Sequence, residues 1–294
     1  MEVSPISLSA IEPARDTLPF EPSFETWRLL STTDRGDNNT FRFILGNEIA
    51  ANAAKSGNIS PWPDGARVAK IAWQQELGAD GLVHPGKFVQ VELMVKDARR
   101  FKDTDGWGWG RWRSLDLRPY GENVHFVDEC TGCHMPMRDN DYVYTLPITS
   151  AHLNREEIVN NAAAALPASL PWQPLGWRAI TIYVDPRTRT TATLYGNDAA
   201  MQVVTRGAAM GESHSSYPSG SFLALVTWSQ RDDPHWFGGR IPDRLSLVEY
   251  VQISSNTDTY HAFVGRALNK EHVGVKSAAL RMKFILGLKP AWLP

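Results

Sequence analysis

Short runs in which apolar and polar residues alternate, separated by turn signals, make up much of this chain. Such alternation over residues 25–33 and 38–45 predicts two strands that form a hairpin around the polar, Gly-containing segment 34–38. The same pattern predicts further strands over 66–73 and 87–95. The chain is therefore expected to fold mainly as antiparallel sheet.

A short helix interrupts these strands. The Ala-rich segment 48–56 follows Asn47, a residue type favoured at helix N-caps, and precedes Gly57, a residue type favoured just after a helix end. Because side chains of a strand alternate between its two faces, one face of the strand over 87–95 should carry the following residues: Phe88, Gln90, Glu92 and Met94.

The pattern occurs twice along the chain. Identical residues lie 150 positions apart in the following pairs: Trp27-Arg28 and Trp177-Arg178, Gly46-Asn47 and Gly196-Asn197, and Gly57 and Gly207. Farther on, segment 62–75 resembles segment 217–230, and Gly207 is expected to end the second helix as Gly57 ends the first. We predict an α+β fold of two tandem β-rich repeats, each a mostly antiparallel sheet with short helices, as domains 1–150 and 151–294.

Composition and charge exclude some classes of protein. The 294 residues are 43% apolar and 21% charged, with a formal net charge of −2, so nucleic acid is not an expected partner. No apolar stretch approaches the roughly 18 residues that would indicate a membrane span. Residues 1–20 lack the charged start and apolar core of a secretory signal.

The clearest chemical motif is Cys130-Thr131-Gly132-Cys133-His134, which has the C-x-x-C-H pattern of c-type haem attachment. Each thiol adds to one vinyl group of the porphyrin, and the adjacent histidine presents a ring nitrogen to the iron. We predict one covalent haem c, with Cys130, Cys133 and His134 binding the cofactor and His134 as the axial iron ligand. Since such attachment normally implies export, a periplasmic location is expected, with the signal peptide outside this sequence.

Other uses of the two cysteines are less favoured. A zinc site needs about four ligands, and the chain has no second cysteine pair. A thioredoxin-like redox pair would begin a helix after a strand of a βαβ unit, and no such unit is predicted.

The second repeat lacks the haem motif. Segment 125–134 aligns with segment 272–281, which carries Ser277, Leu280 and Arg281 at the positions of the two thiols and the ligand histidine. The second copy is therefore expected to be free of haem and to serve in packing or partner contacts. His125 recurs as His272, so a structural role is expected for both.

The second axial position of the iron has no obvious protein ligand. Met135 and Met137 are too close to His134 to reach the opposite haem face, and Met94 is a candidate ligand or a core residue. We favour five-coordinate iron with an open site, which binds small molecules.

Lys70 breaks the pattern of its strand. It shares a predicted face with Ala66, Val68 and Ala72, and the second repeat has Leu225 at its position. A buried lysine has a depressed pKa and is nucleophilic, so Lys70 near a haem edge could bond to the porphyrin. The alternative is a lysine on an edge strand whose stem reaches solvent. Likewise, the alternating Trp107, Trp109 and Trp112 would line a haem pocket or fill a core.

Several of these segments together resemble a known family. They are the Trp-containing first strand, Gly46-Asn47, the Pro-Asp-Gly turn before the strand with Lys70, GWGWGRW at 106–112, and the late haem motif followed by NDYVYT at 140–145. Over roughly residues 20–147 the chain resembles the cytochrome P-460 family, whose relatives are the cytochromes c′-beta.

The resemblance implies a periplasmic, β-rich homodimer with five-coordinate haem c. Members of the P-460 type carry a lysine cross-linked to the porphyrin and oxidise hydroxylamine to nitrous oxide or nitric oxide, and Lys70 matches that catalytic lysine. Members of the c′-beta type lack the bond and bind nitric oxide. Active members also have an acidic residue in the distal pocket; Glu92 and Arg67 are candidates for a polar group there.

Three functions follow from this resemblance and from the residues. The leading one is a haem-dependent hydroxylamine oxidoreductase that passes electrons to a redox partner protein. The alternatives are a non-catalytic nitric oxide binder or sensor, and an electron-transfer cytochrome with Met94 as second axial ligand. Because the family is usually a single domain, the doubled chain is expected to be a monomeric pseudo-dimer or a homo-oligomer.

Overall fold

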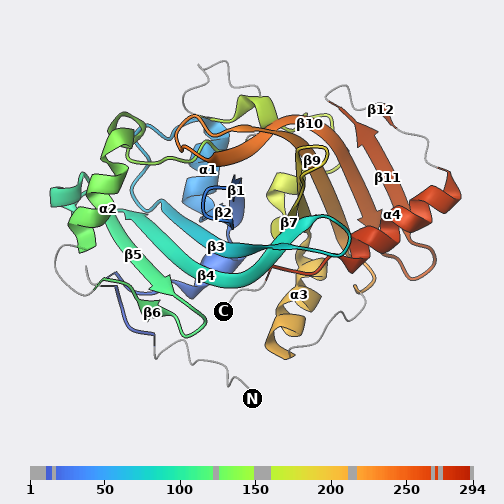
Figure 1. Cartoon of the computed structure of the whole chain (residues 1–294), viewed down its shortest axis with the longest axis horizontal. Helices are drawn as coiled ribbons and strands as arrows, with labels where there is room; N and C mark the ends of the chain where they lie inside the picture. Colours follow the sequence, from blue (N-terminus) through green and yellow to red (C-terminus); the bar gives the residue numbers. More distant parts are fainter. Residues whose placement is uncertain are drawn as a thin grey trace.

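The computed structural model describes residues 11–14, 18–121, 126–148, 160–210, 217–265, 269–270 and 274–291, with only the backbone for 205–210. The first half contains β1 (Arg28–Arg35), β2 (Thr40–Gly46), α1 (Glu48–Ser56), β3 (Arg67–Leu77), β4 (Val83–Lys96), β5 (Trp107–Arg113), β6 (Arg118–Pro119) and α2 (Phe126–His134). The second half contains β7 (Arg178–Asp185), β8 (Thr190–Gly196), α3 (Asp198–Met210), β9 (Phe222–Asp232), β10 (Gly239–Gln252), β11 (Thr259–Val264), β12 (Asn269–Lys270) and α4 (Val275–Gly287). Strands and helices therefore follow one another in the same order in both halves (Figure 1).

The strands of both halves form one continuous sheet. In the described residues, eight strands close into a ring in the order β1-β2-β3-β4-β7-β8-β9-β10, because β1 also pairs with β10. The two joints between the halves are short: Val83 faces Val184 between β4 and β7, and residues 34–35 face 239–240 between β1 and β10. The pairings between these strands are antiparallel, which confirms the predicted β-rich, mostly antiparallel fold. Helices α2 and α4 lie at opposite ends of the molecule (Figure 1).

Local capping signals position the first helix as predicted. The Asn47 side chain accepts a hydrogen bond from the Ala50 N–H at 3.0 Å, and Gly57 follows the last turn with φ 76°, a left-handed conformation that favours glycine. The expectation that Gly207 ends the second helix is wrong, because α3 continues to Met210. A glycine inside a helix costs only about 1 kcal/mol relative to alanine, and the helix-forming residues after it continue the helix.

A bulge in β4 corrects the predicted face of that strand. Trp73 pairs with Phe88 whereas Ala72 pairs with Gln90, so Val89 is an extra residue. The bulge turns Phe88 into the hydrophobic core with Val91, while three residues beyond it, Gln90, Glu92 and Met94, line a cavity. Periodicity alone placed all four residues on one face and missed this shift.

The largest hydrophobic core of the described residues is shared by the two halves. It contains Trp73 from β3 and Trp228 from β9, both fully buried. Above it, Gln75 and Gln230 both donate to the buried carboxylate of Asp34, at 2.6 and 2.9 Å. The halves are therefore packed as one body, and the division into two domains stays a prediction.

Candidate functional site

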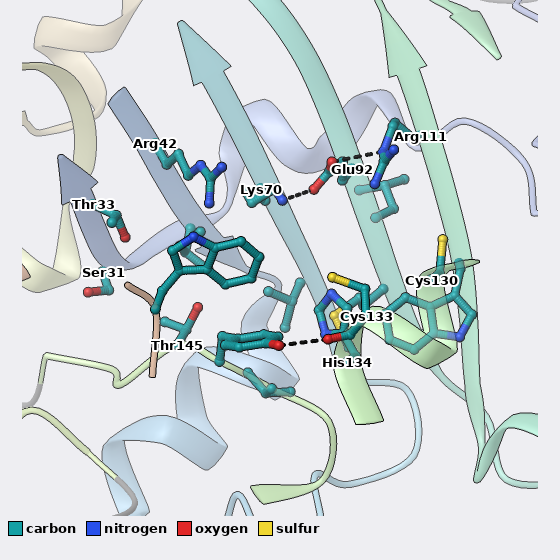
Figure 2. A pocket seen from close by; sticks show the side chains of 18 of the residues that line it. Ser31, Thr33, Arg42, Lys70, Glu92, Arg111, Cys130, Cys133, His134 and Thr145 are labelled. Carbon is teal, nitrogen blue, oxygen red and sulfur yellow. Dashed lines mark hydrogen bonds and ion pairs between the residues drawn. The ribbon is translucent and has the colours of Figure 1, made fainter. Parts of the chain in front are cut away.

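One cavity of about 290 Å³ brings the predicted site residues together. Lys70 on β3, Cys130 and Cys133 on α2, and His134 at the end of α2 all line it (Figure 2). The cavity lies against strands β1 to β5 and is closed on another side by residues 143–146, which follow α2. Lys70 and Cys130, which are 60 positions apart in the sequence, thus line the same cavity.

Helix α2 presents both thiols to this cavity. Cys130 and Cys133 are three residues apart, a spacing that puts two side chains on the same side of a helix. Cys130 is buried and Cys133 is exposed. Phe126, which is 2% exposed, anchors the first turn of α2 in a hydrophobic cluster of the first half.

His134 is held in the protonation state of a metal ligand. Its Nδ1 lies 2.7 Å from the backbone carbonyl oxygen of Tyr142, and since a carbonyl only accepts, Nδ1 carries the hydrogen. Burial lowers the pKa of His134 to about 4, so the ring is neutral at pH 7 and Nε2 keeps its lone pair. The ring packs against Trp109 and Tyr144, with centroid distances of 4.6 and 5.1 Å.

Three charged residues cross the cavity wall in one row. The strand register places Lys70 beside Glu92 and Glu92 beside Arg111. Glu92 forms ion pairs with Lys70 Nζ and, at 2.8 Å, with Arg111 Nε (Figure 2). Burial lowers the pKa of Lys70. Burial alone would raise the pKa of Glu92, but the neighbouring charges of Lys70 and Arg111 outweigh it and hold that pKa below its usual range.

These positions decide between earlier alternatives. Strand β3 lies between β2 and β4, so Lys70 is not on an edge strand. Of the two candidates for the polar pocket group, Glu92 lines the cavity, whereas Arg67 pairs with Glu21 and is not one of its lining residues. Met94 also lines the cavity.

The tryptophans of β5 have different roles. Trp109 lines the cavity, while Trp107 and Trp112 are fully buried in two hydrophobic clusters. His125 and His272, for which a structural role is expected, lie outside the described residues.

The second half supplies a wall of the site that sequence reasoning missed. The segment between β9 and β10 brings Asp233 and Trp236 to the cavity. The Trp236 ring packs edge-on against Tyr144 at 4.7 Å, and His235 Nδ1 lies 2.8 Å from the Tyr144 carbonyl oxygen. The only signal in the sequence was an aromatic pair inside an otherwise polar turn, 231–239, which does not say what it covers.

The donor set fits a haem. Two thiols and a neutral imidazole nitrogen from one helix face a cavity with aromatic walls, and these are the groups that a c-type haem needs. In addition, the guanidinium of Arg42 points to the cavity, and its Nε is buried with no hydrogen-bond partner in the described residues (Figure 2). Burial lowers the pKa of Arg42 to about 10, which still leaves it charged at neutral pH and available to an anionic group.

This fold and site define a candidate haem protein built on a closed antiparallel sheet. The model of the Cytochrome P460 family matches residues 22–145, so this part of the chain is similar to that family, and the similarity implies a haem cofactor. A comparison with curated proteins finds no match to the chain. None of the described helices is long and apolar enough to cross a membrane.

Proposed function

We propose that this chain is a periplasmic c-type mono-haem protein that oxidises hydroxylamine. Cys130 and Cys133 would hold the haem, and His134 would be its axial ligand. One observation carries the proposal. His134 donates its Nδ1–H to the Tyr142 carbonyl, which leaves the lone pair of Nε2 available for iron, and the ring lines the same cavity as both thiols. Metal-ligating histidines commonly donate their other ring N–H to a carbonyl in this way.

The chain's own residues would manage the protons of the reaction. When bound, the haem supplies an iron that takes up electrons from the substrate and passes them to a redox partner protein. Oxidation of hydroxylamine also releases protons, and Glu92 is the carboxylate in the cavity that is held ionised by Lys70 and Arg111. Glu92 would be the ionised carboxylate placed to accept a proton from the N–H or O–H of the substrate once oxidation has made that proton acidic, and Arg111 would keep it oriented.

A second candidate function is nitric oxide binding without turnover. The ion pair between Lys70 and Glu92 favours it, because an ammonium held by a carboxylate is not a nucleophile. A Lys70–porphyrin bond requires that this pair break and that Lys70 lose its proton. The lowered pKa of Lys70 makes that loss easier. The two functions therefore differ in whether Lys70 stays paired with Glu92 or bonds to the porphyrin.

We also infer that the two halves are tandem copies arranged as a pseudo-dimer with one haem. The common order of strands and helices supports this inference, as does a shared capping geometry. Asn197 accepts from the Ala200 N–H at 3.1 Å, and its amide donates to the Gly220 carbonyl, as Asn47 does to Gly65.

The spectrum of the ferrous protein tests these functions. The chain would be produced with the machinery for c-type haem maturation, and its absorption recorded before and after adding nitric oxide. We expect five-coordinate iron, one covalent haem by intact mass, and reduction of an electron acceptor on adding hydroxylamine. Nitric oxide binding without hydroxylamine turnover would select the second candidate, and a six-coordinate low-spin spectrum would indicate electron transfer with Met94.

Matched variants separate the roles of the site residues. Replacing both thiols by serine should abolish covalent haem, and a protein that kept it would contradict the attachment site. Lys70→Met should remove any cross-link detected by peptide mass analysis and abolish hydroxylamine turnover. Lys87→Met, which changes an exposed lysine on β4, should leave mass, spectrum and turnover unchanged.

A further inference from the structure

The chain after the haem motif contains a turn of unusual backbone conformation. Asp141 and Tyr142 are consecutive non-glycine residues with φ of 48° and 66°. This left-handed region is sparsely populated by residues with a side chain, and a bulky residue such as tyrosine is rare there. Surrounding structure must therefore hold the turn, and such conformations are concentrated at functional sites.

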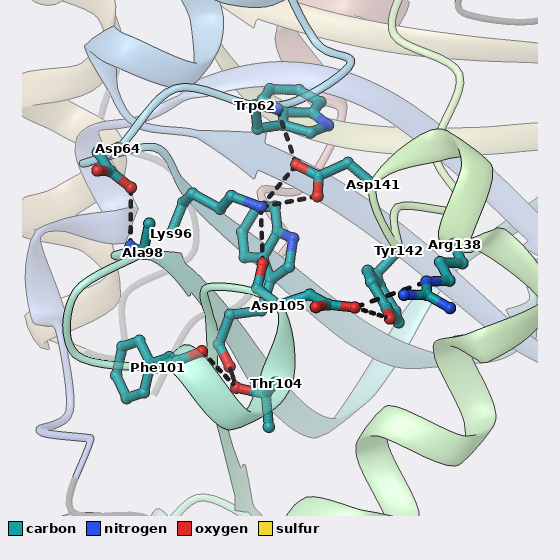
Figure 3. A network of polar contacts seen from close by, with 11 residues as sticks. Trp62, Asp64, Lys96, Ala98, Phe101, Thr104, Asp105, Arg138, Asp141 and Tyr142 are labelled. Carbon is teal, nitrogen blue, oxygen red and sulfur yellow. Dashed lines mark hydrogen bonds and ion pairs between the residues drawn. The ribbon is translucent and has the colours of Figure 1, made fainter.

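A buried ion pair holds this turn. Lys96 Nζ lies 2.7 and 2.9 Å from the two carboxylate oxygens of Asp141, and 3.1 Å from the Asp105 carbonyl oxygen (Figure 3). The Asp141 carboxylate also accepts from the backbone N–H of Trp62 at 2.8 Å. The Lys96 and Asp141 side chains are only 7% and 11% exposed, so water screens their attraction weakly.

The turn controls one atom of the candidate haem site. The carbonyl oxygen of Tyr142 is the acceptor for His134 Nδ1 at 2.7 Å. This carbonyl belongs to the peptide between Tyr142 and Val143, so it leaves the turn one residue after Asp141, and an ion pair that holds Asp141 limits where the acceptor can lie. The Tyr142 hydroxyl donates to the Asp105 carboxylate, which ties the same residue to the loop whose carbonyl binds Lys96 (Figure 3).

The second half shows that the sheet does not need the lysine. Lys96 exchanges backbone hydrogen bonds with Gly65 and Ala66, both 2.9 Å long, and Ile253 makes the corresponding pair with Gly220 and Ser221, also 2.9 Å long. In the second half, which has no haem motif, the apolar residue Ile253 therefore makes the backbone hydrogen bonds that Lys96 makes in the first half. The ion pair is found where a histidine has to be oriented.

We propose that Lys96 and Asp141 are positioning residues for His134. Through the Tyr142 carbonyl, they select the tautomer with hydrogen on Nδ1 and set the direction of Nε2. This inference rests on the proposed function in that His134 is the iron ligand. Partners of this kind tune the basicity of a ligating histidine, and with it the potential of the metal.

The test compares Lys96→Ile, which copies the second half, with Lys96→Arg, which keeps the charge, in the full haem-loaded chain. We expect Lys96→Ile to lower the iron–histidine stretching frequency of the ferrous protein and to shift its reduction potential, and Lys96→Arg to restore both in large part. Arg187→Met removes an exposed ion pair with Asp185 in the second half and should change neither value.

Two outcomes separate this inference from the proposed function. A wild-type chain that acquires no covalent haem overturns the proposed function. A haem-loaded Lys96→Ile chain with unchanged frequency and potential overturns only the positioning role. If Lys96→Ile fails to fold, the same comparison is made with Asp141→Asn. The ¹⁵N shifts of His134 in the full chain with both thiols replaced by serine give a haem-free readout. We expect Lys96→Ile and Asp141→Asn to lose the Nδ1–H tautomer and Lys96→Arg to keep it, and an unchanged tautomer in both Lys96→Ile and Asp141→Asn would overturn the positioning role.

Discussion

Glu92 is the residue on which the charges of the cavity depend. Its carboxylate forms ion pairs with both Lys70 and Arg111, and it also accepts a hydrogen bond from the Gln90 amide at 2.6 Å. Two cations and one anion leave a net positive charge beside the space where a substrate or an anionic group would lie. Removal of this one anion therefore affects two cations together, which makes Glu92 sensitive to substitution.

Glu92→Gln should destabilise the haem-free fold. The change leaves Lys70 without its carboxylate partner and leaves Arg111 with only the more distant carboxylate of Glu129, at 3.6 Å. Breaking a buried ion pair costs about 3–5 kcal/mol. Urea unfolding should show a lower midpoint with an unchanged slope. Asp116→Asn is the matched control, since Asp116 and Arg118 form a pair with side chains 46% and 83% exposed and surface pairs contribute little. Equal midpoints for Glu92→Gln and wild type would contradict the argument.

The same residue gives a pH dependence of defined sign. The pKa of Glu92 is lower in the folded chain than in the unfolded chain, because Lys70 and Arg111 outweigh the effect of burial. Its contribution is therefore present above the unfolded pKa of about 4.3 and lost as the pH falls through the folded pKa. The stability difference between wild type and Glu92→Gln, measured by urea titration from pH 7 to pH 3, should shrink on the acid side. A difference that grows on acidification would exclude this origin.

At the scale of single residues, the sequence predicted what depends on neighbours in the chain. The thiols and His134 form a contiguous motif, so their convergence on one cavity needed no knowledge of the sheet. Lys70 stood out because Leu225 occupies its place in the other half. Its partner Glu92 could not be assigned, because that contact depends on the register of β3 against β4, which a bulge shifts.

At the scale of elements, helix α4 supplies the second half with a cation for a buried carboxylate. Glu249 lies opposite Leu225 in the register of β9 and β10, as Glu92 lies opposite Lys70. Its fully buried carboxylate is bound by Arg281 through two contacts of 2.8 and 2.6 Å, and by the Tyr260 hydroxyl. Arg281 is the residue that aligns with the haem-motif histidine, so α4 carries a cation at the position where α2 carries His134.

Arg281→Met should therefore destabilise the second half strongly. It leaves the Glu249 carboxylate buried without a cation, at a cost of about 3–5 kcal/mol. The double variant Glu249→Leu with Arg281→Met should recover most of that loss, because an apolar pair of similar volume replaces the ion pair. Thermal unfolding of the four proteins completes the cycle. Additive losses in the double variant would mean that Glu249 and Arg281 act independently.

Elements were predictable wherever their ends are determined locally. Asn47 and Gly57 cap α1 with bonds to residues within four positions, and the hairpin of β1 and β2 follows from its turn. Errors arose where a local preference competes with the surroundings. Gly207 lies inside α3 rather than after it, and Phe88 faces the core because of an inserted residue in β4.

At the scale of the whole molecule, closure of the sheet joins the two halves. The joint of β1 with β10 involves residues more than 200 positions apart, and periodicity carries no information about such a pairing. This joint places the segment before β10 over the cavity of the first half. The second half is thus part of the site although it carries no haem motif, which goes beyond the predicted role in packing or partner contact.

Substitution of Trp236 tests whether the segment between β9 and β10 controls access to the cavity. Its indole packs on Tyr144 inside the cavity wall, and the Arg35 guanidinium stacks on it 4.6 Å from the ring centroid. Trp236→Ala should open the wall and speed nitric oxide association with the ferrous protein by about tenfold, the effect of lowering an entry barrier by roughly 1.4 kcal/mol. Flash photolysis of the nitrosyl complex measures this rate. Phe237→Ala changes the adjacent residue, which is 98% exposed, and should leave the rate unaltered. If both variants matched wild type while retaining haem, ligand entry would not pass the segment contributed by the second half, and the joint of β1 with β10 would serve stability alone.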